Sequence, residues 1–310
     1  MATITFGVMS ALLVREQNGA MLETADPIQK VQDFAQLLRE RRRREGMSQL
    51  TLATDAGVSQ RHLSFLESSR ARPSRAMVLQ LAEALALPLR DRNRWLQAAG
   101  FASLFGERPL SSPDMAPVRQ ALELLLKQQE PYPAIVLDVA WNVLMTNGGA
   151  DRLLGFFGDV DALWARVCPE GGRNLMKLTL HPQGLRPLIQ NLEELGPSLL
   201  ARAQREAREH PQAAAVLDTV LAYPGIPPRW RLAEMWMPIV PVLPTRIGLG
   251  NVTLSFITML SSFGTPLDVT ADNLRVECLF PADAATEAIL RAAANTAPLL
   301  RPVHSSPAQG

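Results

Sequence analysis

A twenty-residue segment from Ser48 to Glu67, SQLTLATDAGVSQRHLSFLE, constrains the fold of this chain more than any other feature. Ser48 and Ser59 stand where two short helices would need an N-cap. Small Ala53 suits a close crossing of those helices, and Gly57 suits a tight turn that requires a positive φ. The helical spacing of the apolar residues gives both helices one shared face, formed by Leu52, Val58, Leu63 and Leu66. Together these residues predict a helix-turn-helix motif.

The second helix of such a motif places its N-terminal part in the major groove of DNA. Gln60 and Arg61, with Ser64 one turn later, are therefore expected to face base edges. A glutamine can bridge adenine and an arginine can bridge guanine, each discriminating by about 1–3 kcal/mol. Gln49 begins the first helix, where a phosphate contact is favoured. The candidate DNA-binding residues are Gln49, Ser59, Gln60, Arg61, Ser64, Arg70 and Arg72.

The loop beyond the second helix carries three arginines, Arg70, Arg72 and Arg75. They are expected to follow the DNA backbone, and solvated surface charge is the alternative. His62 either reaches DNA or is simply exposed.

Four consecutive arginines, Arg41 to Arg44, resemble a nucleic-acid patch. Successive helix positions turn by about 100°, so the four side chains spread around the helix and cannot all face one partner. We expect Arg42 to pair with Glu67, because an unpaired Glu67 would place a carboxylate close to the DNA phosphates. Arg42→Ala should then lower the melting temperature.

The distribution of charge agrees with a polyanion-binding segment. Residues 28–101 contain 13 Lys/Arg against 7 Asp/Glu, a net charge of +6, and the remainder contains 18 against 23, a net charge of −5. The overall charge of +1 hides this separation. A basic module beside a neutral or acidic one is the pattern expected of a DNA-binding domain attached to a second domain.

The length of 310 residues predicts two domains. Helical periodicity between Val31 and Gly100, interrupted by Gly and Pro, predicts an all-α domain of five helices over residues 28–101. A linker follows at 102–117, since its 106–117 part, GERPLSSPDMAP, holds three prolines. Residues 1–27 are expected to be disordered or an over-extended start, and residues 297–310 a disordered tail.

The second domain, residues 118–296, shows a mixed pattern. A helix over 118–129 precedes two short apolar runs, 134–139 and 141–146, which are spaced to pair as a hairpin. A helical middle follows, with expected helices at 150–155, 160–167, 185–195, 198–209 and 212–221. Strands are expected again at 235–243, 251–261 and 274–280, before a closing helix at 282–295. This order predicts an α+β domain with an antiparallel sheet.

Composition argues against several other classes of protein. Apolar residues make up 47% and charged residues 20%, the balance of a globular protein. Cys168 and Cys278 are far apart and lack nearby ligand spacing, so we expect no disulfide, no metal site and no cofactor. The apolar runs fall short of the roughly 18–20 residues that span a bilayer. No membrane contact and a cytoplasmic location are expected.

Several segments resemble known regulators. LRERR at 38–42 and SQLTLA at 48–53 look like the Xre class of phage-repressor-like regulators. VSQRHLSFLE at 58–67, RPSRAM at 72–77, LPLRDRN at 87–93 and AAGF at 98–101 are similar to the MmyB-like regulators. PAIVLDVAWNV at 133–143 and Asn147 look like the opening of that family's ligand-binding domain. The resemblance covers nearly all of residues 30–295.

The resemblance implies a PAS-like domain in which a five-stranded antiparallel sheet and flanking helices enclose an apolar cavity. Fatty-acid-like molecules are plausible ligands there. Ser69 departs from the family, which commonly has Gly after the Glu-Ser/Thr pair, so the geometry at this helix end is open. Together with the motif, this predicts a sequence-specific DNA-binding transcription regulator whose C-terminal domain senses a small apolar ligand.

The sequence indicates the ligand-binding residues less directly than the DNA-binding residues. Apolar residues of the second domain could line a cavity, and each could equally belong to ordinary core. The candidate ligand-binding residues are Trp141, Met145, Trp164, Leu175 and Met237. Arg186 or His181 could meet a carboxylate head group if the ligand is an acyl chain.

Two other functions stay open at this point. An enzyme could use Asp138 with Asp151, or His181 with Glu193 and Glu194, or Cys168, but none of these has a recognised catalytic spacing, so no catalytic residue is assigned. The alternative is an antitoxin-like repressor whose second domain docks a protein partner.

A homodimer on operator DNA is also expected. Apolar positions of the 118–129 helix would either form the dimer interface or pack on the second domain. These positions are Val118, Leu122, Leu125 and Leu126.

Overall fold

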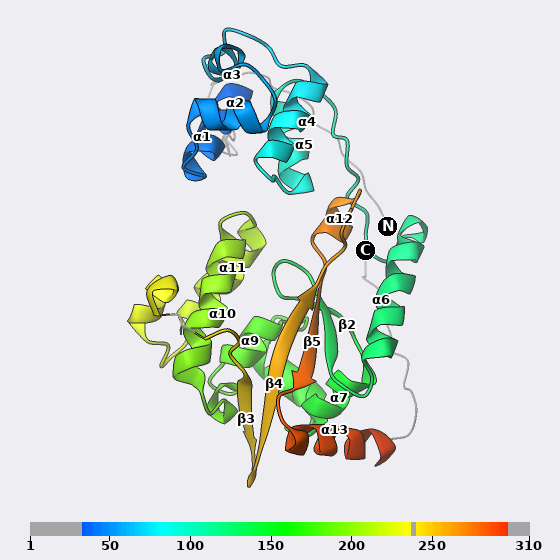
Figure 1. Ribbon diagram of the computed structural model, residues 1–310. Helices are drawn as coiled ribbons and strands as arrows, with labels where there is room; N and C mark the ends of the chain where they lie inside the picture. The colour runs from blue at the N-terminus through cyan, green and yellow to red at the C-terminus, as the bar shows by residue number, and fades with distance from the viewer. Residues whose placement is uncertain (1–32, 237–239, 297–310) are drawn as a thin grey trace, which may run out of the picture.

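The computed structural model describes residues 33–236 and 240–296. An all-helical part precedes an α+β part built on one sheet (Figure 1). The expected disordered ends, residues 1–27 and 297–310, lie outside the described residues.

Five helices form the N-terminal part, as predicted. They are α1 (Phe34–Arg44), α2 (Gln49–Asp55), α3 (Gln60–Glu67), α4 (Arg75–Ala84) and α5 (Leu89–Ala98). Their apolar faces meet in one core, which includes Leu38, Leu52, Leu63, Leu66 and Leu81. Phe34 packs edge-on against Trp95, with ring centroids 5.6 Å apart, and so joins the first helix to the last. All five helices bury apolar residues against one another, which makes this part of the chain a folding unit of its own.

The ends of the motif helices follow the sequence pattern. The Ser48 hydroxyl accepts a hydrogen bond from the backbone N–H of Thr51, and the Ser59 hydroxyl accepts one from that of His62. Gly57 takes a φ of +63° in the turn between α2 and α3. Ser69 takes a φ of +57° after α3, so this serine adopts the left-handed conformation that glycine usually supplies there.

The C-terminal part contains a five-stranded antiparallel sheet, as the resemblance implies. The strands are β1 (Ala134–Leu137), β2 (Val143–Thr146), β3 (Thr245–Leu249), β4 (Val252–Ser261) and β5 (Arg275–Pro281). Their order across the sheet is β2-β1-β5-β4-β3. β5, the last strand in the sequence, therefore lies in the centre and pairs with both β1 and β4.

Helices cover both faces of this sheet (Figure 1). The helices and 3₁₀ turns are η1 (Pro113–Met115), α6 (Ala116–Gln129), α7 (Gly148–Gly155), α8 (Val160–Val167), α9 (Leu175–Leu180), η2 (Arg186–Leu188), α10 (Leu192–Ala207), α11 (Pro211–Leu221), η3 (Pro228–Trp236), α12 (Val269–Asp272) and α13 (Ala284–Thr296). Side chains alternate between faces along β1. Val136 packs towards α6, whereas Ile135 packs towards α9, α10 and α11.

α6 is the helix for which a dimer seam or internal packing was expected. Leu122 and Leu126 are buried and pack on the sheet, with Val118 and Leu125 partly buried beside them. The second of the two alternatives is therefore confirmed, and this face of α6 stabilises the domain itself.

The predicted strand at 235–243 is wrong. Trp236 ends η3, residues 240–244 are not in a strand, and β3 begins at Thr245. Pro241 and Pro244 lack the N–H that a strand donates to its neighbour, so this apolar run cannot pair regularly. Thr245 to Leu249 are free of proline and pair with β4.

Two further differences concern helices and a turn. The helices expected at 185–195 and 198–209 are instead the short turn η2 and one continuous helix, α10, which runs through Pro197. Trp141 was expected to begin the second strand but lies in a turn with a φ of +67°. β2 therefore begins only at Val143.

Several contacts join the two parts of the molecule. The backbone N–H of Leu89 in α5 donates to Asp272 Oδ2 in α12 at 3.0 Å. Arg41 Nη1 in α1 lies 2.9 Å from Glu209 Oε1, just after α10. Gly106, in the connecting segment, forms a parallel bridge with Asp268.

Candidate nucleic-acid interface

The beginning of α3 is open to solvent. Gln60 and Arg61 are exposed, Ser59 is exposed beside them, and Ser64 is half-buried. Arg61 extends over the ring of Phe65, with its guanidinium carbon 5.4 Å from the ring centroid. This cation–π contact attracts the guanidinium to the face of the ring.

Three further candidates follow α3 in the sequence. Arg70 and Arg72 are exposed in the loop after α3, and Arg75 is exposed at the start of α4. None of the three forms an ion pair with an acidic residue within residues 33–236 and 240–296. Their charges are available to an outside anion such as a phosphate. His62 is half-buried.

Arg42 and Glu67 form the predicted ion pair. Arg42 Nε lies 2.5 Å from Glu67 Oε1 and Arg42 Nη2 lies 2.8 Å from Glu67 Oε2, so both oxygens are engaged. Arg42 also donates to the backbone oxygen of Met47 at 2.7 Å. Only 11% of the arginine side chain and 4% of the glutamate side chain are exposed. The pair is buried between α1 and α3 and fixes the orientation of the recognition helix.

Glu67 has two more donors. The side-chain amide of Gln49 donates to Glu67 Oε2 at 2.7 Å, and Arg39 donates to the backbone oxygen of Glu67. Burial opposes ionisation of Glu67, but the hydrogen bonds from Arg42 and Gln49 outweigh it, so its pKa is lowered. The carboxylate therefore stays charged, and Arg42 neutralises its charge. A phosphate contact by Gln49 would require exchange of its bond to Glu67.

The four consecutive arginines separate as expected. Arg42 is buried, Arg43 and Arg44 are exposed, and Arg41 is paired with Glu45 at 3.0 Å and with Glu209. Arg41 therefore contacts the second domain.

The candidate ligand residues lie in different apolar clusters. Trp141 packs against the helices on one face of the sheet, and Met145 packs with α6 on the other. Trp164 belongs to a third cluster around α8, which Leu175 joins to that of Trp141. Met237 lies outside the described residues.

A polar group that the sequence did not reveal surrounds Trp141. The indole N–H donates to Glu206 Oε2 at 2.5 Å, and the guanidinium carbon of Arg202 lies 4.1 Å from the ring centroid. Arg202 Nη1 is 3.9 Å from Glu277 Oε1 on the central strand. Burial raises the pKa of Glu277, against the opposing effect of Arg202. This group joins α10 to the sheet across the turn that holds Trp141.

The residues considered for catalysis have structural contacts. Asp138 accepts from the backbone N–H of Ala140 and of Asn142, and Asp151 accepts from the Thr146 hydroxyl. Cys168 is buried, and burial raises the pKa of its thiol, which disfavours the nucleophilic thiolate.

His181 packs edge-on against Tyr223, with ring centroids 4.9 Å apart, and burial lowers its pKa. Arg186, the other candidate for a head group, is half-buried.

Metal-binding clusters and membrane-spanning helices are both absent from the described residues. Among them, no group of His, Cys, Asp and Glu is arranged to hold a metal ion. No helix of these same residues has the length and apolar character needed to cross a bilayer.

Comparisons with known proteins agree with the two parts of the structure. A helix-turn-helix family model matches residues 38–91. A second model, described as the MmyB-like transcription regulator ligand binding domain, matches residues 118–293, more than half of the chain. The comparison with curated proteins gave no match. The chain therefore belongs to the MmyB-like transcription regulators, with an Xre-class helix-turn-helix before the ligand-binding domain, and is a DNA-binding transcription regulator.

Proposed function

We propose that this regulator recognises a specific operator in double-stranded DNA through the N-terminal end of α3. The exposed side chains of Gln60 and Arg61 carry the proposal, because they extend from a helix that the buried Arg42–Glu67 pair holds in place. Gln60 would read adenine and Arg61 guanine in the major groove. Arg70, Arg72 and Arg75 would contact phosphates on either side.

A genome-wide DNA pull-down tests the readout. Purified wild type, the double variant Gln60→Ala/Arg61→Ala and a control, Gln183→Ala/Arg229→Ala, are compared by sequencing the bound fragments. The control removes the same two residue types from exposed positions of the second domain. Wild type and control should enrich one shared sequence motif that the α3 variant loses. Equal enrichment by all three proteins would refute readout by these residues.

We also propose that the C-terminal domain responds to a small, largely apolar molecule, with fatty acids among the candidates. The match to a ligand-binding domain over residues 118–293 supports this. Mass spectrometry of the organic extract of purified protein tests it. A single enriched apolar compound is expected, whereas a stoichiometric copurifying protein and an empty extract would favour a partner-docking repressor instead.

Finally, we propose that the protein binds its operator as a homodimer, since two half-sites about one helical turn apart suit this class of motif. The apolar face of α6 with Leu122 and Leu126 already packs on the sheet, so the dimer would use another surface. Sedimentation should show a dimer at micromolar protein, and a monomer with or without operator DNA would refute it.

A further inference from the structure

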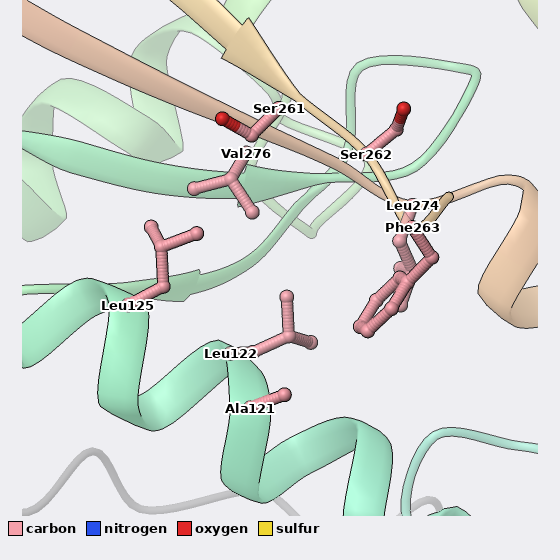
Figure 2. Close-up of a pocket in the computed structure, with 8 residues that line it drawn as sticks. All are labelled: Ala121, Leu122, Leu125, Ser261, Ser262, Phe263, Leu274 and Val276. Atoms are coloured by element: carbon pink, nitrogen blue, oxygen red, sulfur yellow. The ribbon is translucent and has the colours of Figure 1, made fainter. Parts of the chain in front are cut away.

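A pocket opens between α6 and the sheet, and none of the ligand residues expected from the sequence lines it (Figure 2). It encloses about 350 Å³ of empty space, its open mouth included. Side chains from α6 face those from the ends of β4 and β5 across it. The lining residues are Ala121, Leu122, Leu125, Ser261, Ser262, Phe263, Leu274 and Val276. All of them fall within residues 118–293, the part matched by the ligand-binding family model.

The lining determines what kind of molecule fits. Six of the eight lining residues are apolar, and the other two, Ser261 and Ser262, are exposed and offer hydroxyl groups. No charged side chain is among them, so a carboxylate in this pocket would lose its hydration without gaining a counter-ion. An apolar body with one neutral hydrogen-bonding group would keep its polar end at the serines.

One wall of the pocket leads directly to the DNA-binding domain. Phe263 and Leu274 stand on either side of the segment that contains α12. Asp272 in that helix accepts the backbone N–H of Leu89 at the start of α5. Any displacement of Phe263 or Leu274 by a bound molecule would therefore move the helix on which α5 rests.

The connecting segment is tied to the same place. The N–H of Val269 donates to the backbone oxygen of Gly106 at 2.7 Å, and Arg108 pairs with Asp268 at 3.1 Å. Leu110 packs into the apolar cluster that contains Leu122 and Leu274. Two of the links between the domains, through α12 and through the connecting segment, thus start at the pocket.

We propose that this pocket is the effector site and that it binds a small neutral molecule with an apolar body and one hydrogen-bonding group. Binding of this molecule in the pocket acts on the DNA-binding domain through α12 and residues 106–110. The inference rests on the proposed response to an apolar ligand. It adds a position and a preference for neutral compounds over carboxylates.

Calorimetric titration of the full-length protein with 1-octanol and with octanoate tests both additions, since the two probes have equal chain length. Three proteins are used: wild type, Ala121→Phe and Leu124→Phe. Ala121 is exposed at the pocket, so a phenyl ring there blocks the opening without disturbing the core. Leu124 is 57% exposed on the same helix and does not line the pocket. Equal melting temperatures for the three proteins verify that the variants fold.

Wild type and Leu124→Phe should bind octanol about tenfold or more tightly than octanoate, and Ala121→Phe should lose about tenfold in octanol affinity. Hydrogen exchange at α12 and residues 106–110 should change when octanol binds to wild type and not when it is added to Ala121→Phe. Unaltered octanol binding by Ala121→Phe would overturn the position, and tighter binding of octanoate would overturn the neutral preference. Failure of wild type to bind octanol would overturn both. The mass spectrometry of bound compounds decides the proposed ligand response independently of any of these results.

Discussion

Removal of Arg42 should destabilise the DNA-binding domain strongly. Arg42→Ala deletes two hydrogen bonds to Glu67 and one to the backbone of Met47, and it leaves the carboxylate buried. Breaking one side of a buried ion pair typically costs about 3–5 kcal/mol. Gln49 still donates to Glu67, and the positive charge of Arg39 still lowers its pKa, so we expect a loss near the lower limit, about 3 kcal/mol.

For a domain of this size, such a loss corresponds to a fall in melting temperature of about 12–24 °C. Circular dichroism on heating measures the transition, and hydrogen exchange in α1 and α3 assigns it to the DNA-binding domain. The double variant Arg42→Met/Glu67→Leu is the control, because it removes both charges and keeps apolar volume. It should be within about 1 kcal/mol of wild type. A loss below about 0.5 kcal/mol for Arg42→Ala would refute the reasoning.

Three other predictions concern Glu67, Gly196 and the Arg41–Glu209 pair. The pKa of Glu67 is lowered in the folded state, so its contribution to the free energy of unfolding should be complete above its ordinary pKa of 4.5 and lost as the pH falls through the folded pKa. The free energies of unfolding of wild type and Glu67→Gln, measured by urea titration, should therefore converge in acid. A difference between them that does not change with pH would contradict this. A Cβ on Gly196 would lie 2.3 Å from the buried ring of Trp230. Gly196→Ala should therefore lower the free energy of unfolding in urea by about 1–3 kcal/mol. An unchanged free energy would show that α10 and η3 can move apart at little cost. Arg41→Glu and Glu209→Arg should each increase protease cleavage within residues 102–117, and the double variant should restore protection if the two side chains pair as they do here.

The helix-turn-helix could be predicted because its determinants are local. Caps, a turn glycine and helical spacing all lie within twenty residues, and each has a direct physical meaning. The Arg42–Glu67 pair could also be predicted, since four consecutive arginines cannot all face one partner and an unpaired Glu67 would place a carboxylate close to the DNA phosphates. Ser69 shows the limit of this approach, because its left-handed backbone is held by the surrounding helix end rather than by its residue type.

Other features depend on long-range packing. The sequence predicts the strand before β4 at 235–243, too early, because the apolar residues there suggest a strand despite the prolines among them. It does not predict α12, because four residues are too few to show helical periodicity. The turn at Trp141 combines local hydrogen bonds to Asp138 with contacts of the indole to Arg202 and Glu206, which lie far along the chain. The pocket could likewise not be predicted from the sequence, because α6 and the strand ends that form it become neighbours only in the folded domain.

The central position of β5 has a consequence for synthesis of the chain on the ribosome. The core of helices α1 to α5 uses residues 34–101 alone, so this domain can fold as soon as it has emerged. The sheet cannot close at that stage, since β5 joins the β1–β2 pair to the β3–β4 pair and is made almost last. A chain terminated before Arg275 would consequently carry a complete DNA-binding domain joined to two unconnected strand pairs, and it would occupy DNA without any means of sensing an effector.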